Sequence, residues 1–290
     1  MLLLLIKLLI AAAVLESLDV PVLPGLSVRI AGGDTAEYTP WIAALSFGDV
    51  NKRFQCAGSI ITDRHILTAA HCVESAFYNG QLASTYMATV GTNVRDGSGQ
   101  NYKIIKNYTH PEFTLQYVKN DIAILVTNSS IEFSMMVQPV TVNFNRVNDG
   151  VAAIILGWGS QSLRGNTSQE LIELEMVTIN STYCFDETRR VGKSLNLIPP
   201  FIDSEKEICA YRAPGKGTCK GDSGSPLVCA DNEEQIGLTS WGIPCALGAP
   251  DMFTRISNYK DWIMSVLADM QYEDKLSWSM RECPKNEYIY

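Results

Sequence analysis

Residues 172–176 read Ile-Glu-Leu-Glu-Met, an alternation of apolar and acidic side chains. This period-2 pattern is typical of a β-strand with one buried and one solvated face. Short apolar runs bounded by turn residues recur along the chain, at 58–61, 121–126 and 152–157. Because no long helical pattern separates these runs, the sequence predicts an all-β barrel or sandwich.

One α-helix is predicted near the C-terminus. Its apolar positions recur at helical spacing: Tyr259, Trp262, Ile263, Val266 and Leu267. Ser257 precedes them and is a suitable N-cap. Upstream, the stretch 143–150 is the expected boundary between two halves of the fold, and residues 271–290 form an irregular C-terminal extension.

The composition excludes several classes of protein. The 290 residues include 31 Asp or Glu and 23 Lys or Arg, which gives a formal net charge of −8. A general nucleic-acid binder needs basic surface, so we expect no nucleic-acid partner. With 19% charged and 46% hydrophobic residues, the chain is neither disordered nor a coiled coil.

The N-terminus predicts secretion. Leu2 to Leu15 is apolar except for Lys7. As a helix these fourteen residues would span about 21 Å, less than the roughly 30 Å hydrocarbon core of a bilayer. A signal peptide at 1–16 therefore fits better than a membrane anchor, and the protein is expected outside the cell. An exposed linker follows at 17–29.

The cysteines and sequons agree with an extracellular location. Eight cysteines are present and none forms a C-x-x-C pair, which favours disulfides over a zinc or thioredoxin-type site. Four N-x-[ST] sequons are candidate glycosylation sites: Asn107, Asn128, Asn166 and Asn180.

Three polar residues stand in sequence contexts that suggest nucleophilic catalysis. His71 follows Leu67-Thr68-Ala69-Ala70, Asp121 opens a buried run, and Ser223 lies in Gly221-Asp222-Ser223-Gly224. Acyl transfer by a serine needs a base, a carboxylate that orients it, and donors for the oxyanion. Taken singly, each residue has an ordinary alternative: a structural histidine, a strand-end aspartate and a surface turn.

Together these segments resemble the chymotrypsin-like (trypsin-like) serine endopeptidase family, from about Arg29 to Met270. The His…Asp…Ser order separates them from subtilisins and α/β-hydrolases. The resemblance implies two antiparallel Greek-key β-barrels packed face to face, with the active site between them. It also implies catalysis by His71, Asp121 and Ser223, with the amides of Gly221 and Ser223 as the oxyanion hole.

The segment Arg29-Ile30-Ala31-Gly32-Gly33 resembles the activation site of that family, with Ala31 where valine or isoleucine is usual. The resemblance implies an inactive precursor that an activating protease cleaves after Arg29. The propeptide is then 17–29 and the protease domain 30–270. The freed Ile30 amine would pair with Asp222.

Family disulfides map onto three pairs: Cys56–Cys72, Cys184–Cys209 and Cys219–Cys245. Cys229 and Cys283 remain. The position where relatives carry the partner of Cys229 holds Ala153 here. We therefore predict a Cys229–Cys283 bond, with a bridge from Cys283 to another chain as the alternative.

The resemblance also locates the primary specificity pocket. Gly217 occupies its base, where an aspartate would select lysine or arginine, and the walls come from Ser240-Trp241-Gly242. Asp251 aligns with a wall position that is usually glycine. Gly217 with Asp251 resembles brachyurin-like proteases and implies broad or chymotrypsin-like specificity. The alternative is that Asp251 is a turn residue facing solvent.

No cofactor or metal is expected. In particular, 91–102 carries only one acid, Asp96, and a single carboxylate makes a poor calcium site. Expected partners are protein or peptide substrates, the activating protease and protein protease inhibitors. A catalytically silent homologue that binds a partner is the rival function. The intact set of nucleophile, base and carboxylate argues against it.

Overall fold

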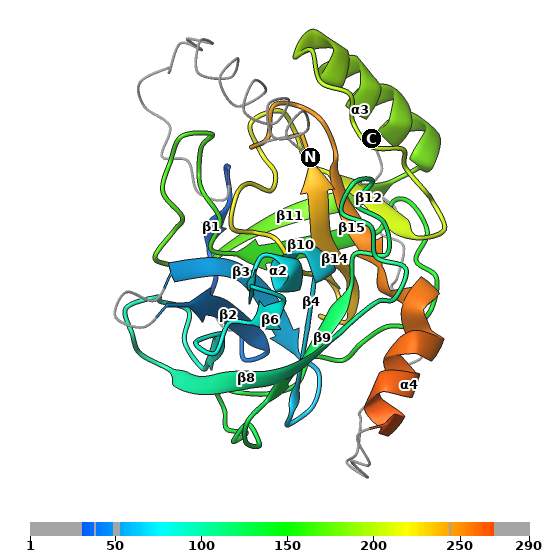
Figure 1. Ribbon diagram of the computed structural model, residues 1–290. Helices are drawn as coiled ribbons and strands as arrows, with labels where there is room; N and C mark the ends of the chain where they lie inside the picture. The colour runs from blue at the N-terminus through cyan, green and yellow to red at the C-terminus, as the bar shows by residue number, and fades with distance from the viewer. Residues whose placement is uncertain (1–30, 38, 49–52, 244, 270–290) are drawn as a thin grey trace.

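The computed structural model describes residues 31–37, 39–48, 53–243 and 245–269. Most of its strands belong to two closed antiparallel barrels that lie against each other (Figure 1). The first barrel has the strand order β2-β3-β4-β9-β8-β7. Its strands are β2 Ile42–Phe47, β3 Arg53–Ile60, β4 His65–Thr68, β7 Met87–Val90, β8 Gln100–Thr109 and β9 Ala123–Thr127.

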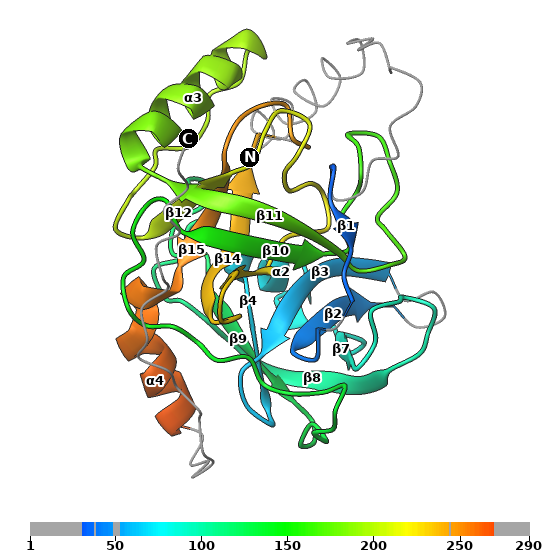
Figure 2. The ribbon, with the colours of Figure 1, turned by 180° about the vertical axis from the view of Figure 1, so that it is seen from behind.

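The second barrel has the order β11-β10-β13-β14-β15-β12 and is closed by pairing of β11 with β12. Its strands are β10 Ala152–Gly157, β11 Ile172–Ile179, β12 Glu207–Tyr211, β13 Pro226–Cys229, β14 Gln235–Gly242 and β15 Asp251–Arg255. Strand β1 (Asp34–Thr35) comes before the first barrel in the chain but pairs with β11 of the second. Figure 2 shows β1 and β11 from behind. The predicted all-β, two-barrel fold is confirmed.

The alternating stretch 172–176 forms the first part of β11. Ile172, Leu174 and Met176 are buried, and Glu175 is exposed. Leu174 pairs with Ile155 of β10, which also belongs to the core of the second barrel. The apolar runs predicted as strands lie in or overlap β3, β9 and β10, so the strand pattern was read correctly from the sequence.

A further hydrophobic cluster joins the barrels. It combines Ile42 and Ile124 of the first barrel with Val228 and Leu238 of the second, and Trp158 is fully buried in it. Burial of apolar surface stabilises a fold by about 25 cal/mol per Å², so this shared core contributes strongly to the contact between the barrels. The two barrels are therefore held in a fixed orientation.

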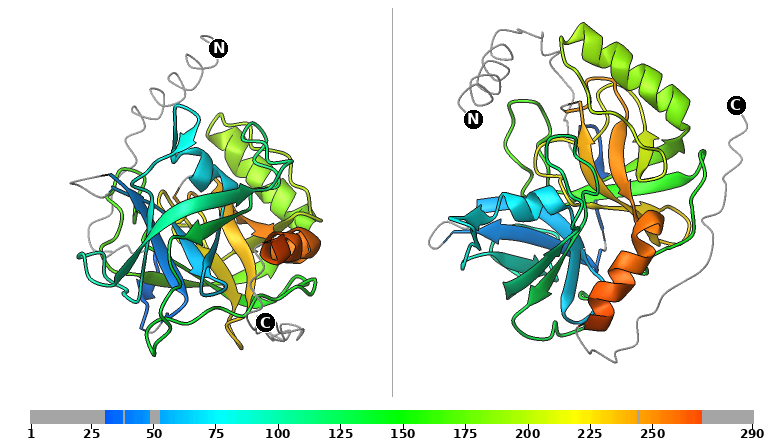
Figure 3. Two further views of the ribbon diagram at one scale, coloured as in Figure 1. Left: turned by 60° about the horizontal axis from the view of Figure 1, so that its bottom comes forward. Right: turned by 45° about the vertical axis from the view of Figure 1, so that its right-hand side comes forward.

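Helices lie outside the barrels: α2 Ala70–Glu74, α3 Ser181–Ser194 and α4 Lys260–Asp269, with a 3₁₀ turn η1 at Ile256–Tyr259 and a small β5–β6 hairpin, Phe77–Tyr78 with Gln81–Leu82. Helix α4 runs from the second barrel past the first (Figure 3). Its Ile263, Val266 and Leu267 enter the shared core, as predicted. Ser257 is not its N-cap, because Ser257 lies inside η1.

Helix α3 is not predicted by the hydrophobic pattern of the sequence. Its buried face is formed by Cys184, Thr188, Val191 and Gly192, which have helical spacing but include only one large apolar residue. The detectable signal was Asn180, whose side chain caps the helix by accepting a hydrogen bond from Tyr183 N. Within the described part of the chain, no helix is long and apolar enough to cross a membrane.

Candidate active site

The position of His71 is set by a disulfide and by buried neighbours. Strand β4 ends at Thr68, and the short helix α2 then carries His71. Cys72 is bonded to Cys56 of β3, so α2 is fastened to the barrel wall. Cys72 and Val73 are buried, whereas the His71 side chain remains partly exposed. The backbone of His71 is therefore held in place by covalent and packed neighbours on either side.

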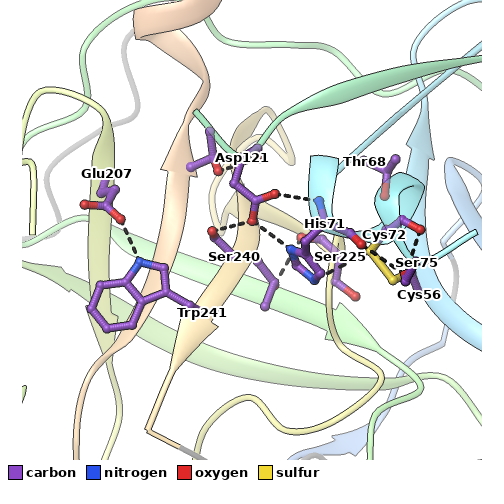
Figure 4. A network of polar contacts seen from close by, with 12 residues as sticks. Cys56, Thr68, His71, Cys72, Ser75, Asp121, Glu207, Ser225, Ser240 and Trp241 are labelled. Atoms are coloured by element: carbon purple, nitrogen blue, oxygen red, sulfur yellow. Dashed lines mark hydrogen bonds and ion pairs between the residues drawn. A yellow bond between two sulfur atoms is a disulfide. The ribbon is translucent and has the colours of Figure 1, made fainter. Parts of the chain in front are cut away.

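Asp121 is directed at His71. His71 Nδ1 lies 2.8 Å from Asp121 Oδ2, and the His71 backbone N–H donates to Oδ1 over 2.9 Å. Asp121 is 2% exposed and lies two residues before β9. Ser240 Oγ donates to Asp121 Oδ2 over 2.6 Å, and Thr254 Oγ1 donates to the Asp121 carbonyl over 2.7 Å. Figure 4 shows this network.

These contacts cross between the barrels, because Ser240 lies on β14 and Thr254 on β15. A buried carboxylate is costly unless its charge is compensated by partners, and here both oxygens accept hydrogen bonds. Burial by itself lowers the pKa of His71, but the charge and hydrogen bond of Asp121 outweigh it, so the pKa of His71 is raised. Asp121 therefore stabilises the imidazolium and orients the ring.

The turn that carries Ser223 packs against the residues that precede α2. A Cβ on Gly224 would lie 2.3 Å from Thr68 Oγ1 and 2.5 Å from the Ala57 carbonyl, and Gly224 has φ +73°. Only glycine fits here. The Ser223 carbonyl accepts a hydrogen bond from Ala57 N over 2.9 Å. The half-buried Ser223 is thus held beside the segment that leads into His71.

The same turn presents unpaired amides. The backbone N–H groups of Cys219, Asp222, Gly224 and Ser225 all donate to protein acceptors. Those of Gly221 and Ser223 have no acceptor among the described residues. Two neighbouring free donors beside a serine can bind a developing negative charge.

Asp222 points away from this surface into the interior. It is fully buried, and its oxygens accept from Gly159 N over 2.8 Å and Cys219 N over 2.9 Å. Burial raises the pKa of Asp222 to about 7. Among the described residues it has no cationic partner. The predicted partner Ile30, and the cleavage residue Arg29, lie outside the described residues. The next residue, Ala31, is buried, and its carbonyl accepts from Gly217 N over 3.3 Å.

Asp251 lies beside two of the residues predicted to line the specificity pocket. If Gly217 carried a Cβ, that atom would lie 2.6 Å from Asp251 Oδ2, and a Cβ on Gly242 would lie 3.0 Å from Asp251 Oδ1. The Asp251 carboxylate therefore lies between the two glycines. Thr218 donates to it from N over 2.9 Å and from Oγ1 over 2.7 Å. Asp251 is 3% exposed, so the solvent-facing alternative is wrong. Burial raises the pKa of Asp251 to about 7.

Two of the predicted wall residues have further partners that sequence reasoning missed. Ser240 directs its hydroxyl at Asp121, as described above, rather than at the pocket. Trp241 Nε1 donates to the buried Glu207 over 2.7 Å, and Lys119 Nζ pairs with the other Glu207 oxygen over 2.7 Å. These partners are far apart in sequence, 119 positions in the case of Ser240 and Asp121, so no local motif reveals them.

The disulfides Cys56–Cys72, Cys184–Cys209 and Cys219–Cys245 are present as predicted. Cys229 is buried opposite Ala153 in the β10–β13 register, the position to which the resemblance assigns its usual partner. No described cysteine is free. The predicted partner Cys283 lies outside the described residues.

The candidate modification and metal residues are also placed. Asn128, Asn166 and Asn180 are exposed, and Asn107 is half-buried. Asp96 accepts a hydrogen bond from Ser98 N. One described cluster has metal-ligand geometry: Cys56, His71 and Cys72. Its two sulfur atoms are joined in a disulfide and are not thiolate ligands.

A buried carboxylate bonded to an imidazole, with the turn of Ser223 packed against the segment that leads into that imidazole, is the arrangement expected of a serine hydrolase site. The trypsin family model matches residues 30–263. The chain is 30% identical to alkaline trypsin A of Manduca sexta, over 89% of this chain and 98% of that one. It is 33% identical to venom serine protease Bi-VSP of Bombus ignitus, over 80% and 67%. The clotting factor G beta subunit of Tachypleus tridentatus shares 30% identity, over 82% and 79%. The chain belongs to the trypsin family and is a serine endopeptidase.

Proposed function

We propose that this chain is the secreted zymogen of a serine endopeptidase with broad or chymotrypsin-like specificity, activated by cleavage after Arg29. The observation that carries the proposal is the pairing of His71 with Asp121 at 2.8 Å, beside the turn of Ser223. A silent homologue usually lacks a member of the catalytic set, whereas His71, Asp121 and Ser223 are all present here.

In the proposed reaction, Ser223 Oγ attacks the carbonyl carbon of the scissile peptide bond while His71 takes the hydroxyl proton. The oxyanion accepts hydrogen bonds from the amides of Gly221 and Ser223. His71 then gives its proton to the leaving amine, which leaves an acyl-enzyme on Ser223. Water, deprotonated by His71, hydrolyses the ester and restores Ser223. Asp121 keeps the imidazole oriented and stabilises its cation throughout.

Activation is proposed to act through Asp222. Hydrolysis of the Arg29–Ile30 bond creates a new amine at Ile30, one residue before the buried Ala31. A cation is the partner that the buried Asp222 lacks among the described residues, and an ion pair would offset part of its desolvation cost. Pairing would hold Asp222 inward, and with it the adjacent amides of Gly221 and Ser223.

The proposed primary specificity follows from the pocket. With glycine at 217 and 242, the base and wall of the pocket carry no side chains of their own, and a large residue before the scissile bond is the proposed occupant. The Asp251 carboxylate lies between them and offers a polar or cationic side chain a partner. Aromatic and basic residues before the scissile bond are therefore both proposed substrates.

We also propose a division of the chain into four segments. The signal peptide is 1–16, the propeptide 17–29, the protease domain 30–270 with the barrel boundary near 143–150, and the extension 271–290. A Cys229–Cys283 bond would tie the extension to the second barrel. An activating protease and protein inhibitors are proposed partners, and the four sequons are proposed glycan sites.

The decisive test uses the purified full chain. Limited tryptic digestion should produce a new N-terminus at Ile30 together with peptidase activity. A serine-directed organophosphate should then form one adduct, on Ser223, and abolish the activity. The variant Ser223→Ala, cleaved in the same way, should neither react nor hydrolyse peptides. Cleaved wild-type protein that forms no adduct would instead support the silent homologue.

A further inference from the structure

Arg95 occupies an unusual place between the barrels. It lies in the loop between β7 and β8 of the first barrel, and its backbone N–H donates to the Gln169 carbonyl over 2.8 Å. The neighbouring Val94 forms an antiparallel bridge with Glu170. This loop of the first barrel is thus attached by backbone contacts to the segment that enters β11 of the second.

The Arg95 side chain makes a dense set of contacts. Nε donates to the Ser168 carbonyl over 2.9 Å, and Nη2 donates to the same carbonyl over 2.6 Å and to Thr167 Oγ1 over 2.9 Å. The guanidinium lies 4.2 Å from the centre of the Phe54 ring. It forms no ion pair with any described acid. Planar stacking and forked donation are properties of arginine that lysine lacks.

The residues that Arg95 holds are the ones against which Gly221 packs. A Cβ on Gly221 would lie 2.9 Å from Thr167 Cγ2, 3.3 Å from Phe54 Cε1 and 3.2 Å from Gly159 Cα. Phe54 also borders a cavity of about 130 Å³, whose lining includes Arg95 and Trp158. The guanidinium of Arg95 lies over the Phe54 ring, and Trp158 meets that ring edge-on, with 6.0 Å between ring centres.

We propose that Arg95 is a positioning residue for the oxyanion hole: it clamps Thr167 and Phe54 against Gly221 and so fixes the direction of the Gly221 amide. This inference rests on the proposed function. Arg95 touches neither substrate nor reacting atoms, and it acts through the residues that contact Gly221. Loss of the clamp should weaken stabilisation of the transition state while leaving binding of the ground state intact.

The test compares Arg95→Met and Arg95→Lys with wild type, all cleaved and titrated for active sites. Removing an oxyanion donor lowers kcat by about 10²- to 10³-fold. Arg95→Met displaces a donor without removing it, so kcat should fall by about tenfold with KM unchanged. The kcat of Arg95→Lys should lie between those of Arg95→Met and wild type. A peptide aldehyde, which forms a tetrahedral adduct on Ser223, should lose affinity by the same factor. The matching peptide alcohol should not.

Arg190→Met is the matched control, since Arg190 is exposed on α3 and pairs with Glu187. If Arg95→Met folds poorly, Thr167→Val removes the hydroxyl acceptor alone and should show a smaller loss in the same aldehyde-to-alcohol ratio. The inference is overturned if that ratio matches wild type in the folded variants, or if aldehyde and alcohol weaken equally. Wild type without organophosphate labelling would mark failure of the proposed function instead.

Discussion

The buried carboxylate in the pocket leads to a quantitative prediction for Asp251→Asn. The substitution keeps the shape between Gly217 and Gly242 and removes the charge. A hydrogen bond to a charged group contributes about 1.5–3 kcal/mol, and about 1.4 kcal/mol corresponds to tenfold in rate. The ratio of kcat/KM for arginine over phenylalanine substrates should therefore fall by about ten- to 150-fold.

The pKa of Asp251 determines the direction in which the preference for arginine should change with pH. Burial raises the pKa of Asp251 to about 7, so the carboxyl is neutral at lower pH and ionised above. The preference for arginine should therefore rise with pH, with a midpoint no higher than about 7. If Asp251 titrates with a pKa of about 7, its ionised fraction rises by about tenfold between pH 6 and pH 8. In Asp251→Asn the ratio should not change with pH.

The assay is a pair of peptide substrates that differ only in the residue before the scissile bond, measured on activated, site-titrated enzyme from pH 5 to 9. Taking the ratio cancels the titration of His71, which affects both substrates alike. An Asp251→Asn ratio equal to that of wild type at every pH would show that the carboxylate does not reach the substrate.

Three further predictions follow from the same contacts. Ser240→Ala removes the hydroxyl that donates to Asp121 Oδ2. Loss of this one hydrogen bond should lower kcat by about three- to tenfold with KM unchanged, and a change in KM alone would contradict the assignment. Gly224→Ala places a Cβ 2.3 Å from Thr68 Oγ1 at a positive φ, and should lower the free energy of unfolding by more than about 2 kcal/mol, measured by urea denaturation; wild-type stability would contradict the packing. In the uncleaved chain, the pKa of Asp222 is raised, so the folded protein binds this proton more tightly than the unfolded protein does. The stability that protonated Asp222 contributes is therefore complete below about pH 4 and is lost as the pH rises towards 7. Asp222→Asn should remove this part of the pH dependence of the melting temperature, and an unchanged pH dependence would refute the assignment.

Much of this molecule follows from local sequence, and the remainder depends on contacts between distant segments. Alternation in β11 and the apolar face of α4 are local properties, so both were predictable. Helix α3 escaped detection because its buried face relies on Cys184, Thr188 and Gly192, whose burial is decided by what packs on them. Ser257 has the chemistry of an N-cap, but the chain forms a 3₁₀ turn there first.

The site shows the same division. His71, Asp121 and Ser223 are marked by their sequence surroundings, and the fold brings their segments together. The hydroxyls of Ser240 and Thr254, which complete the environment of Asp121, stand in no recognisable motif. These two hydroxyls reach Asp121 only because β14 and β15 of the second barrel lie next to this residue of the first barrel.

The two buried carboxylates of the second barrel also link activation to specificity. The charge of Asp222 contributes to the raised pKa of Asp251, after burial and against the hydrogen bonds from Thr218. An Ile30 amine paired with Asp222 would cancel that repulsion, so cleavage after Arg29 should lower the pKa of Asp251. The pocket would then become more fully ionised in the enzyme than in its precursor. Carboxyl ¹³C NMR, assigned through Asp251→Asn, should show the Asp251 midpoint below about 7 after cleavage and higher before it; an identical midpoint in both forms would mean that the two acids do not interact.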